Sequence, residues 1–259
     1  GALFVPRGGA VNVGAMVDAL LDAAQARGAT IETQAPVLYW RETPGAAVVE
    51  VDRGDDTEEL RADRVLLALG QGYPPFPELR RLGLDGVKGQ TVRVRRPEPL
   101  SDPLPPMSGR GYIVPEGDAL VLGSNYENNF DDLSPTPDAT AYIQEKTSDL
   151  IPEVQHAEVR GEVAGVRVKH SATNRPLLGP LPRRERLWAF TALGSKGLLT
   201  APILALTRPT PLSSPGKIPA IASTRGGQPQ RRAHALPALT PVERFRATAA
   251  VRSRPRPRH

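Results

Sequence analysis

The chain has 259 residues, a formal net charge of +5 and 39% hydrophobic residues, which is enough material for one large domain or two smaller ones. It contains no cysteine, so disulfides, thiolate metal sites, cysteine nucleophiles and covalent thioether links to a flavin are excluded. No apolar run approaches the roughly 20 residues that span a bilayer, so we expect a soluble, cytoplasmic protein without a membrane partner.

The first third of the chain predicts a helix followed by several strands. Asn12 is a good helix N-cap, apolar residues follow it at helical spacing, and Gly28 is the expected C-terminal glycine, so residues 12–27 predict an amphipathic helix. Strands are expected at 29–33, 36–40, 46–52 and 59–68. Val65 to Leu69 is continuously apolar, which predicts a central buried strand ending in a turn at Gly70. Ligands in open α/β sheets bind at such strand ends.

The second part of the chain predicts a mixed set of elements. Strand-like alternation or a hairpin is expected at 90–95, 112–124 and 158–169, and a helix at 136–150. A strand at 187–192 is followed by the glycine-rich turn Gly194–Gly197 and by an apolar helix over 198–206. Pro202 is tolerated near the start of that helix.

Basic charge is concentrated at the end of the chain. Residues 207–259 carry 11 lysines and arginines and one acid, which leaves 22 basic and 27 acidic residues in 1–206. Nine prolines and the lack of a periodic apolar face predict a disordered basic tail. A nucleic-acid-binding arm is the alternative interpretation of this tail, but a nucleic-acid partner is not expected, because the charge does not lie on a folded face.

Common catalytic motifs are missing from the sequence. It has no phosphate-binding loop of the G-x-x-x-x-G-K-[ST] type, no H-E-x-x-H and no G-x-S-x-G, and its four histidines are isolated. Gly70-Gln71-Gly72 begins like a dinucleotide fingerprint, but Pro74 and Pro75 prevent a helix from starting there. We therefore expect no metal site in the protein, and no phosphate-binding loop at the turn that starts with Gly70.

Three positions could contribute to a ligand site. The turn Gly194–Gly197 precedes a helix, whose exposed N–H groups bind anions, although a plain strand-to-helix turn has the same pattern. Arg167 alternates with Val166 and Val168 in a strand and could bind a carboxylate, or could simply face solvent. Tyr112 could offer its phenol to a substrate, or could be an ordinary strand aromatic.

Several short motifs follow one another in a characteristic order. They are Gly1–Pro6, Asn12, Gly28-Ala29, Ala68-Leu69-Gly70, Gly89-Gln90, Gly111–Pro115, Leu122-Gly123-Ser124, Gly165-Val166-Arg167, Arg175–Gly179 and Gly194–Pro202. This succession, over roughly residues 1–206, resembles the FAD-dependent D-amino acid oxidase superfamily. Glycine oxidase, sarcosine oxidase and the oxidase half of the tRNA-modifying methylaminomethyl-uridine enzyme are nearest in pattern.

The resemblance implies roles for individual positions. It implies non-covalent FAD as the cofactor, bound by Val37, Ala68, Gly70, Gly179, Gly194, Ser195, Lys196, Gly197 and Leu198. It places Arg167 at the carboxylate of an amino acid substrate and Tyr112 near the substrate. In this chemistry the substrate amine transfers a hydride to the flavin, so positioning and electrostatics matter more than a protein acid or base, and no acid–base residue is assigned.

The family pattern starts with a strand, a G-x-G-x-x-G turn and a helix, and the sequence begins after them. We therefore expect an α+β fold in which residues 1–85 and 166–206 form a remnant of an FAD/NAD(P)-binding α/β domain and 86–165 a mixed β-sheet substrate domain, followed by the disordered tail 207–259. The resemblance implies a truncated fragment, whose missing N-terminal half could be on another chain.

The expected function is FAD-dependent oxidation of a small-molecule amine or amino acid, and whether this chain is itself active is left open. One alternative is a flavin-dependent dehydrogenase that passes electrons to an acceptor other than oxygen. The other is a non-catalytic binding protein whose basic tail contacts nucleic acid.

Overall fold

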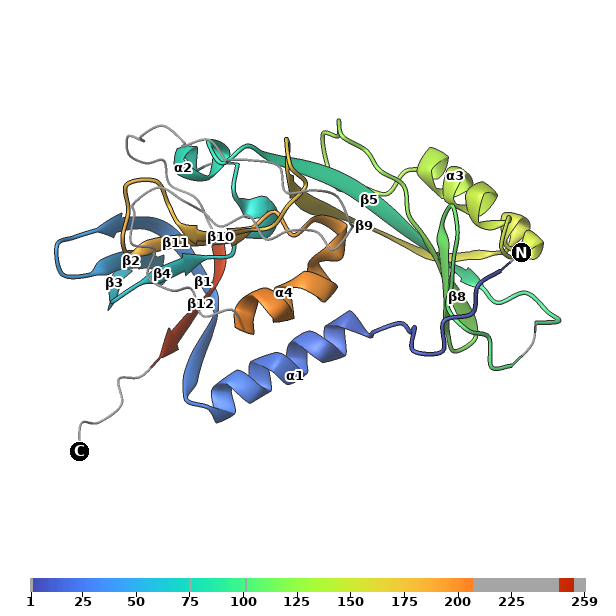
Figure 1. Ribbon diagram of the computed structural model, residues 1–259, viewed down its shortest axis with the longest axis horizontal. Coiled ribbons are helices and arrows are strands. Elements are labelled where there is room, and N and C mark those ends of the chain that lie inside the picture. The colour runs from blue at the N-terminus through green and yellow to red at the C-terminus, as the bar shows by residue number, and fades with distance from the viewer. Residues whose placement is uncertain (1, 75, 101, 207–246, 254–259) are drawn as a thin grey trace. The chain divides into compact units, whose positions relative to one another are not determined.

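The computed structural model describes residues 2–74, 76–100, 102–206 and 247–253 (Figure 1). The helices are α1 (Val13–Ala26), α2 (Pro77–Arg80), α3 (Pro137–Thr147) and α4 (Gly197–Leu206), with 3-10 turns at Gly70–Gly72, Pro152–His156 and Gly194–Lys196. The strands are β1 (Ala29–Glu42), β2 (Ala47–Asp52), β3 (Thr57–Ala62), β4 (Val65–Leu67), β5 (Leu84–Arg95), β6 (Met107–Ser108), β7 (Tyr112–Glu116), β8 (Ala119–Gly123), β9 (Val159–His170), β10 (Leu177–Pro180), β11 (Leu187–Thr191) and β12 (Ala247–Ser253). This mixture of helices and sheets confirms the expected α+β class.

The chain divides into two compact units. Unit 1 comprises Gly1–Leu20 and Val87–Val166, and unit 2 comprises Leu21–Gly86 and Arg167–His259. Unit 2 is therefore built from two segments that are far apart in the sequence. The assignment of FAD binding to 1–85 and 166–206, and of substrate binding to 86–165, stays a prediction.

Two sheets make up the described part of unit 2. One has the order β12-β1-β2-β3, and the other has the order β10-β11-β4, in which β4 and β11 are parallel. The turn between β2 and β3 depends on Gly54, which has a φ of +91° and whose N–H donates to Asp52 Oδ1 over 2.8 Å. A left-handed φ of this kind favours glycine because any Cβ would be strained.

The structure differs from the predicted strands at two places in unit 2. Residues 29–33 and 36–40 belong to one strand, β1, which is irregular around Gln34 with a φ of +54°. Residues 59–68 form no single strand, because the chain bends at 63–64 and separates β3 from β4, each in its own sheet.

The strand β4 lies at a sheet edge and not at the centre that its apolar sequence predicts. Its pairing partner is β11, and in the described part of the chain no strand pairs with its other edge. Leu67 is buried against the core, but the side chain of Leu66 on the opposite face is 53% exposed. A continuously apolar strand is normally covered on both faces, and here Leu66 on one face is only half covered by the described residues.

The core of unit 2 joins its two sheets. It contains Trp40 and Val51 from the first sheet and Leu67, Leu187 and Ala189 from the second. The rings of Trp40 and Phe76 pack against each other with their centroids 4.0 Å apart and their planes tilted by 31°. Glu42 adds a polar link, because its carboxylate accepts the backbone N–H groups of Glu185 and Arg186.

Unit 1 is a sheet with the order β6-β7-β8-β5-β9 that packs on α3. Its core contains Val92 and Val94 of β5, Ile113 of β7 and Ile143 of α3, together with Leu120, Leu122, Ile151 and Val154. Because side chains alternate along a strand, Tyr112 and Val114 lie on the sheet face opposite α3.

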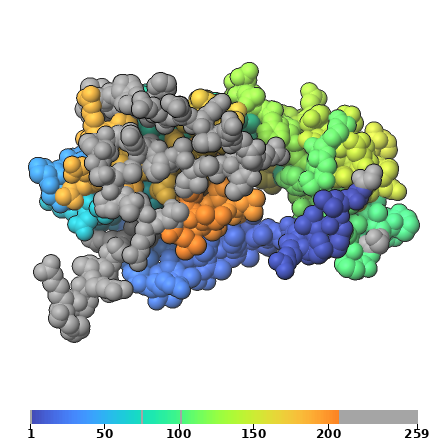
Figure 2. Space-filling view, in the orientation of Figure 1, coloured from blue at the N-terminus to red at the C-terminus, as the bar shows by residue number. Residues whose placement is uncertain are grey.

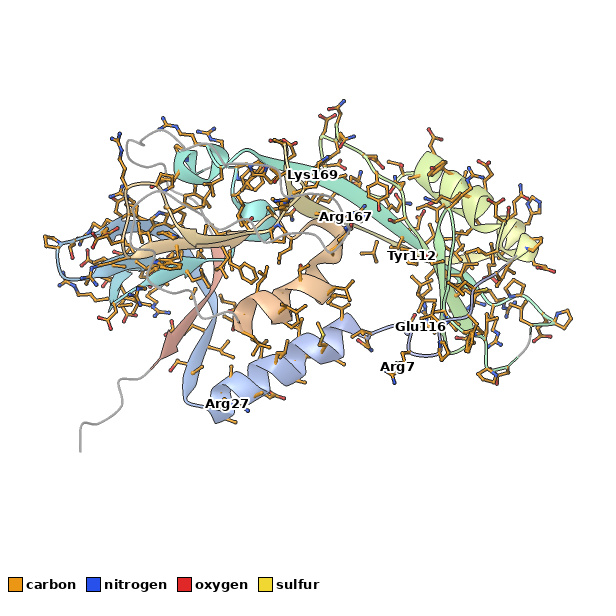
Figure 3. The ribbon with its side chains drawn as sticks, viewed as in Figure 1. Arg7, Arg27, Tyr112, Glu116, Arg167 and Lys169 are labelled. Carbon is orange, nitrogen blue, oxygen red and sulfur yellow. The ribbon has the colours of Figure 1, made fainter. Side chains whose placement is uncertain are left out.

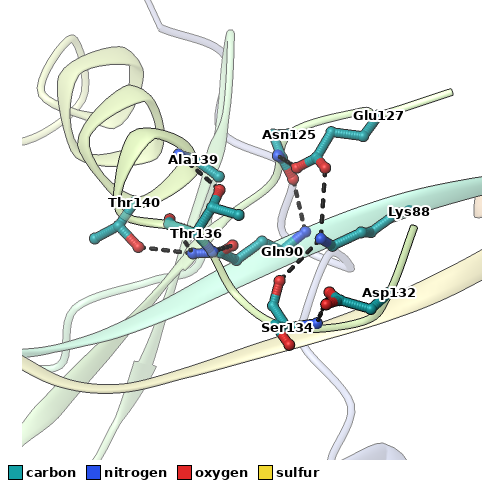
Figure 4. A network of polar contacts seen from close by, with 9 residues as sticks. All are labelled: Lys88, Gln90, Asn125, Glu127, Asp132, Ser134, Thr136, Ala139 and Thr140. Atoms are coloured by element: carbon teal, nitrogen blue, oxygen red, sulfur yellow. Dashed lines mark hydrogen bonds and ion pairs between the residues drawn. The ribbon is translucent and has the colours of Figure 1, made fainter. Parts of the chain in front are cut away.

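A buried polar network fixes the start of α3 (Figure 4). The side chain of Gln90 on β5 accepts the backbone N–H of Thr136 over 2.8 Å and donates to Thr140 Oγ1 over 2.6 Å. Thr136 in turn caps α3, its Oγ1 accepting the N–H of Ala139 over 3.3 Å. Two residues before Gln90, the buried Lys88 donates to the backbone oxygen of Ser134 over 2.8 Å. These contacts serve the fold, because each polar group already has a protein partner.

The expected N-terminal helix is present as α1, and the Asn12 side chain accepts the N–H of Ala15 over 3.1 Å, as an N-cap should. Its apolar residues are not buried: Val13, Val17 and Leu20 are 47%, 44% and 62% exposed. The surface of α4, orange in Figure 2, is similarly apolar, with Leu199 74% exposed. Both helices therefore carry apolar surface that the described residues do not cover.

Most of the predicted disordered tail lies outside the described residues. Within it, residues 247–253 form β12, a strand that pairs antiparallel with β1 and that the expectation of disorder did not include. No helix among the described residues is long and apolar enough to cross a membrane.

Candidate functional site

The candidate cofactor site starts at the parallel pair β4 and β11 of unit 2. Val65 pairs with Leu187 and Leu67 with Ala189, so the two strands end at the same edge of the sheet. Ala68 and Gly70 follow β4, and the segment Gly194–Leu198 follows β11. The structure thus brings these predicted cofactor residues to one sheet edge, where α/β proteins bind ligands.

The segment after β11 is shaped for close approach of a ligand. Gly194 has a φ of +56°, and a Cβ built on it would have no neighbour closer than 4.0 Å. Ser195 and Lys196 are exposed, and α4 starts at Gly197. The first N–H groups of a helix lack intrahelical partners and favour a negatively charged group. This loop can therefore hold an anion or a negatively polarised ring edge.

The side chain of Thr191, at the end of β11, shows whether this site could accept a polar ligand such as a flavin. Its Oγ1 is buried and has no hydrogen-bond partner among the described residues. Buried hydroxyls are normally paired, so an orphan immediately before this loop fits a ligand that supplies a hydrogen bond. The described residues fit the ring end of FAD in this respect. The turn Gly70–Gly72 does not fit the pyrophosphate of FAD. It is followed by Tyr73 and not by a helix whose N-terminal N–H groups could bind the phosphates.

Two other predicted cofactor residues lie within strands. Val37 is on β1, where its side chain is 9% exposed in the unit 2 core and it pairs with Val51. Gly179 is on β10 and pairs with Ala189 of β11. Both belong to the same unit as the loop after β11. Their contact with adenine or flavin stays a prediction.

Arg167 lies on β9 at the start of the second segment of unit 2 (Figure 3). The adjacent Val168 is buried in the core, so the half-buried Arg167 and Lys169 lie on the opposite face of the strand. Lys169 pairs with Leu193 in an isolated antiparallel bridge, next to Gly194. β9 is therefore attached directly to the loop that precedes α4.

Tyr112 belongs to unit 1, and its position depends on a glycine across the sheet. It pairs with Gly123 of β8, and Gly123 pairs with Thr91 of β5. A Cβ built on Gly123 would overlap the ring and hydroxyl of Tyr112, so the ring lies directly over the Gly123 backbone. This arrangement presents the phenol on the sheet face away from α3.

The segment that follows Gly70 is anchored by a tyrosine. The Tyr73 hydroxyl donates to the backbone oxygen of Leu84 over 2.9 Å. Burial, reinforced by the charge of Asp85, raises the pKa of Tyr73 above its ordinary value. The phenol therefore stays neutral at physiological pH and keeps its proton for this hydrogen bond.

Comparison with known proteins identifies the family. Residues 1–207 match the protein family described as DAO, FAD-dependent oxidoreductase. The chain belongs to this family. It is 32% identical over 209 residues to the tRNA 5-methylaminomethyl-2-thiouridine biosynthesis bifunctional protein MnmC of Idiomarina loihiensis. The matched region covers 79% of this chain and 33% of that protein. It is 34% identical over 148 residues to glycine oxidase of Pseudomonas putida, covering 55% of the chain and 40% of that enzyme.

Solved structures of this family share the fold. Glycine oxidase from Geobacillus kaustophilus superposes with a TM-score of 0.56 at 24% identity, over 66% of the chain and 46% of that enzyme. The DAO-family chain thus spans between a third and a half of the length of these relatives.

The sequence analysis gave no role to Lys169 and Thr191 of unit 2 or to Gly123 of unit 1. Lys169 lies beside Gly194 through the bridge to Leu193, and Gly123 lies under Tyr112. The alternation Arg167, Val168, Lys169 was a usable signal for the first. Gly123 belongs to the motif Leu122-Gly123-Ser124, but its position under Tyr112 depends on the register of β7 and β8.

Proposed function

We propose that this DAO-family protein takes part in FAD-dependent oxidation of the C–N bond of a small amine or amino acid. The observation that carries this proposal is the convergence of Ala68, Gly70 and the loop Gly194–Leu198 at one edge of the parallel pair β4 and β11. FAD, when bound, supplies a hydride acceptor for the carbon next to the amine nitrogen. Membership of an FAD-dependent oxidoreductase family supports that chemistry.

The residues of this chain would act by binding and orienting. The N–H groups at the start of α4 would stabilise negative charge on a bound ring, and the flexible cation of Lys196 would add to this effect. Arg167 would bind a substrate carboxylate through two parallel hydrogen bonds. For Tyr112, on the sheet face of unit 1 away from α3, contact with a substrate stays a prediction. No protein acid or base is required, because positioning supplies much of the rate.

The pyrophosphate of FAD needs further contacts. We propose that they come from the region that the relatives have beyond the part matched here. Two observations support this proposal: among the described residues no strand pairs with the second edge of β4, and Leu66 is half-exposed. A parallel strand in an α/β sheet is normally covered.

The first experiment is an absorption spectrum of the purified chain after incubation with excess FAD and removal of free ligand. We expect bands at about 370 and 450 nm, as for a bound flavin. Lys196→Glu should lower FAD retention, whereas the matched control Arg61→Glu on β3 should not. A colourless protein would refute FAD binding by this chain.

Turnover then separates an oxidase from a dehydrogenase. Flavin-loaded protein is incubated with small amines and amino acids, and hydrogen peroxide is measured. Peroxide formed in step with substrate loss supports the oxidase. Flavin reduction without peroxide in air supports the dehydrogenase, which uses another acceptor. Unchanged substrate affinity in Arg167→Ala would exclude the proposed carboxylate contact.

A further inference from the structure

We infer that α4 docks the protein on an anionic phospholipid surface. The helix lies along the bilayer, and the leucine and isoleucine side chains on its outer surface enter the interfacial region. This role goes beyond the proposed function, which uses only the loop at the start of the helix.

The outer surface of α4 is apolar and is not covered by the described residues. Leu199, Ile203 and Leu206 are 74%, 62% and 83% exposed, and their spacing of i, i+4 and i+7 places them in one stripe along the helix. Leu198, which is 49% exposed, extends the stripe at its start. Figure 2 shows α4 in orange. Contiguous exposed apolar surface of this kind marks a site of contact with a protein, a ligand or a membrane.

The helix has no side chain that requires contact with water. Between Gly197 and Leu206 there is no charged residue. The one polar side chain belongs to Thr200, whose hydroxyl donates to the backbone oxygen of Lys196 over 2.9 Å. A helix that is apolar on all sides belongs either in a protein core or against lipid, and Leu204 is the only residue of α4 that is fully buried.

The charge of the surrounding sequence favours lipid. No aspartate or glutamate occurs between Arg186 and Val242, and Lys196 directly precedes the helix. The sequence after α4, 207–259, carries 11 lysines and arginines and one acid. Anionic headgroups attract basic segments, and this attraction adds to the burial of apolar side chains in the same bilayer.

The combination of the two features distinguishes a bilayer from other partners. A protein partner could cover the leucines, but their burial in it would not account for the cations on both sides of the helix. Nucleic acid would account for the cations and leave the leucines exposed. An anionic bilayer has a charged surface above an apolar layer, so it satisfies both features at once.

The length of α4 determines how it meets the bilayer. Ten residues at about 1.5 Å each give a helix of about 15 Å, half the roughly 30 Å of a hydrocarbon core. The helix therefore lies on the membrane and does not cross it. The sequence analysis expected no membrane partner because no segment is long enough to span a bilayer, and surface binding does not require such a segment.

The test is flotation of the full chain with two kinds of vesicle, one of phosphatidylcholine alone and one of phosphatidylcholine and phosphatidylglycerol in equal parts. We expect partitioning into the anionic vesicles to be about tenfold stronger, and to weaken about tenfold in about 0.5 M sodium chloride. The double substitution Leu199→Gln/Ile203→Gln should lower partitioning about tenfold, because two apolar side chains no longer enter the bilayer. The control Leu3→Gln/Val163→Gln, which alters two similarly exposed side chains of unit 1, should stay within about twofold.

Fluorescence reports insertion independently of the flotation assay. Leu206→Trp places an indole at the most exposed position of α4, and its emission should shift to shorter wavelength when anionic vesicles are added. The native Trp40 and Trp188 are 3% and 9% exposed, so the shift reports position 206.

Three results would overturn the inference. The first is that the wild type floats with neither vesicle, or equally with both. The second is that Leu199→Gln/Ile203→Gln floats like the wild type, because the cations alone then recruit polyanions of any kind. The third is a dimer in size-exclusion chromatography that this double substitution abolishes, with no flotation, because a second copy then covers α4. If circular dichroism shows that the double variant is unfolded, Leu206→Gln is measured in its place with the same expectations.

Discussion

The substitution Gly123→Ala tests how the sheet of unit 1 holds Tyr112. A methyl group at position 123 would overlap the ring and hydroxyl of Tyr112, so the ring or the strand must move. Forcing extra atoms into a packed site costs about 1–3 kcal/mol. We expect the free energy of unfolding to fall by this amount.

A double-mutant cycle isolates the cause. In a Tyr112→Ala background the obstacle is gone, so Gly123→Ala should cost less than about 0.5 kcal/mol, and the coupling energy should exceed about 1 kcal/mol. The four proteins are compared by urea denaturation followed by circular dichroism. Gly161→Ala on β9 of the same unit is the control, because a Cβ there would have no atom within 4 Å. Additive effects of the two substitutions would refute the proposed contact.

Two further predictions concern the loop and helix that follow β8. Gln90→Leu leaves the backbone N–H of Thr136 without its acceptor and removes one of the two hydrogen bonds of the Thr140 hydroxyl, which keeps its contact with Glu162. The free energy of unfolding should therefore fall by about 1–3 kcal/mol, and amide hydrogen exchange at the start of α3 should accelerate. Exchange rates equal to those of the wild type would contradict this role. Hydrogen bonds from the backbone and side chain of Ser134 lower the pKa of Asp132 from its ordinary 3.8. A lowered folded-state pKa stabilises the protein above pH 3.8, and the contribution disappears as pH falls through the folded-state pKa. Asp132→Asn should therefore lower stability at neutral pH and not at the acid end of a pH titration, and a constant difference across that titration would argue against it.

Local signals predicted the elements whose ends are set by local chemistry. Asn12 caps α1 and Thr136 caps α3, where the sequence placed helix starts. The hairpin of β7 and β8 turns at Gly117, which has a φ of +61°. In each case a side chain or a glycine within a few residues decides the conformation, so the sequence contains the information.

Features that depend on distant partners were not predictable in the same way. β3 and β4 are separate strands because β4 pairs with β11 (Leu187–Thr191), which is far away in the sequence. No residue near position 63 predicts this break. The position of Lys169 beside Gly194 depends on a bridge to Leu193. The resemblance to a family indicated which residues belong together, but it gave no geometry for residues outside the family motifs.

The way in which unit 2 is divided along the chain has a consequence for biosynthesis. The parallel pair of β4 and β11 cannot form until Leu187, the partner of Val65, has been synthesised. The unit 1 segment 87–166 is translated before that point. The sheet of unit 1 has its strands β6, β7 and β8 close together in sequence and can pair soon after they leave the ribosome. During that interval the apolar β4 has no partner strand. We expect the nascent chain to be most vulnerable to aggregation and proteolysis in this window, so that codon changes that slow synthesis between 87 and 187 would lower the yield of folded protein.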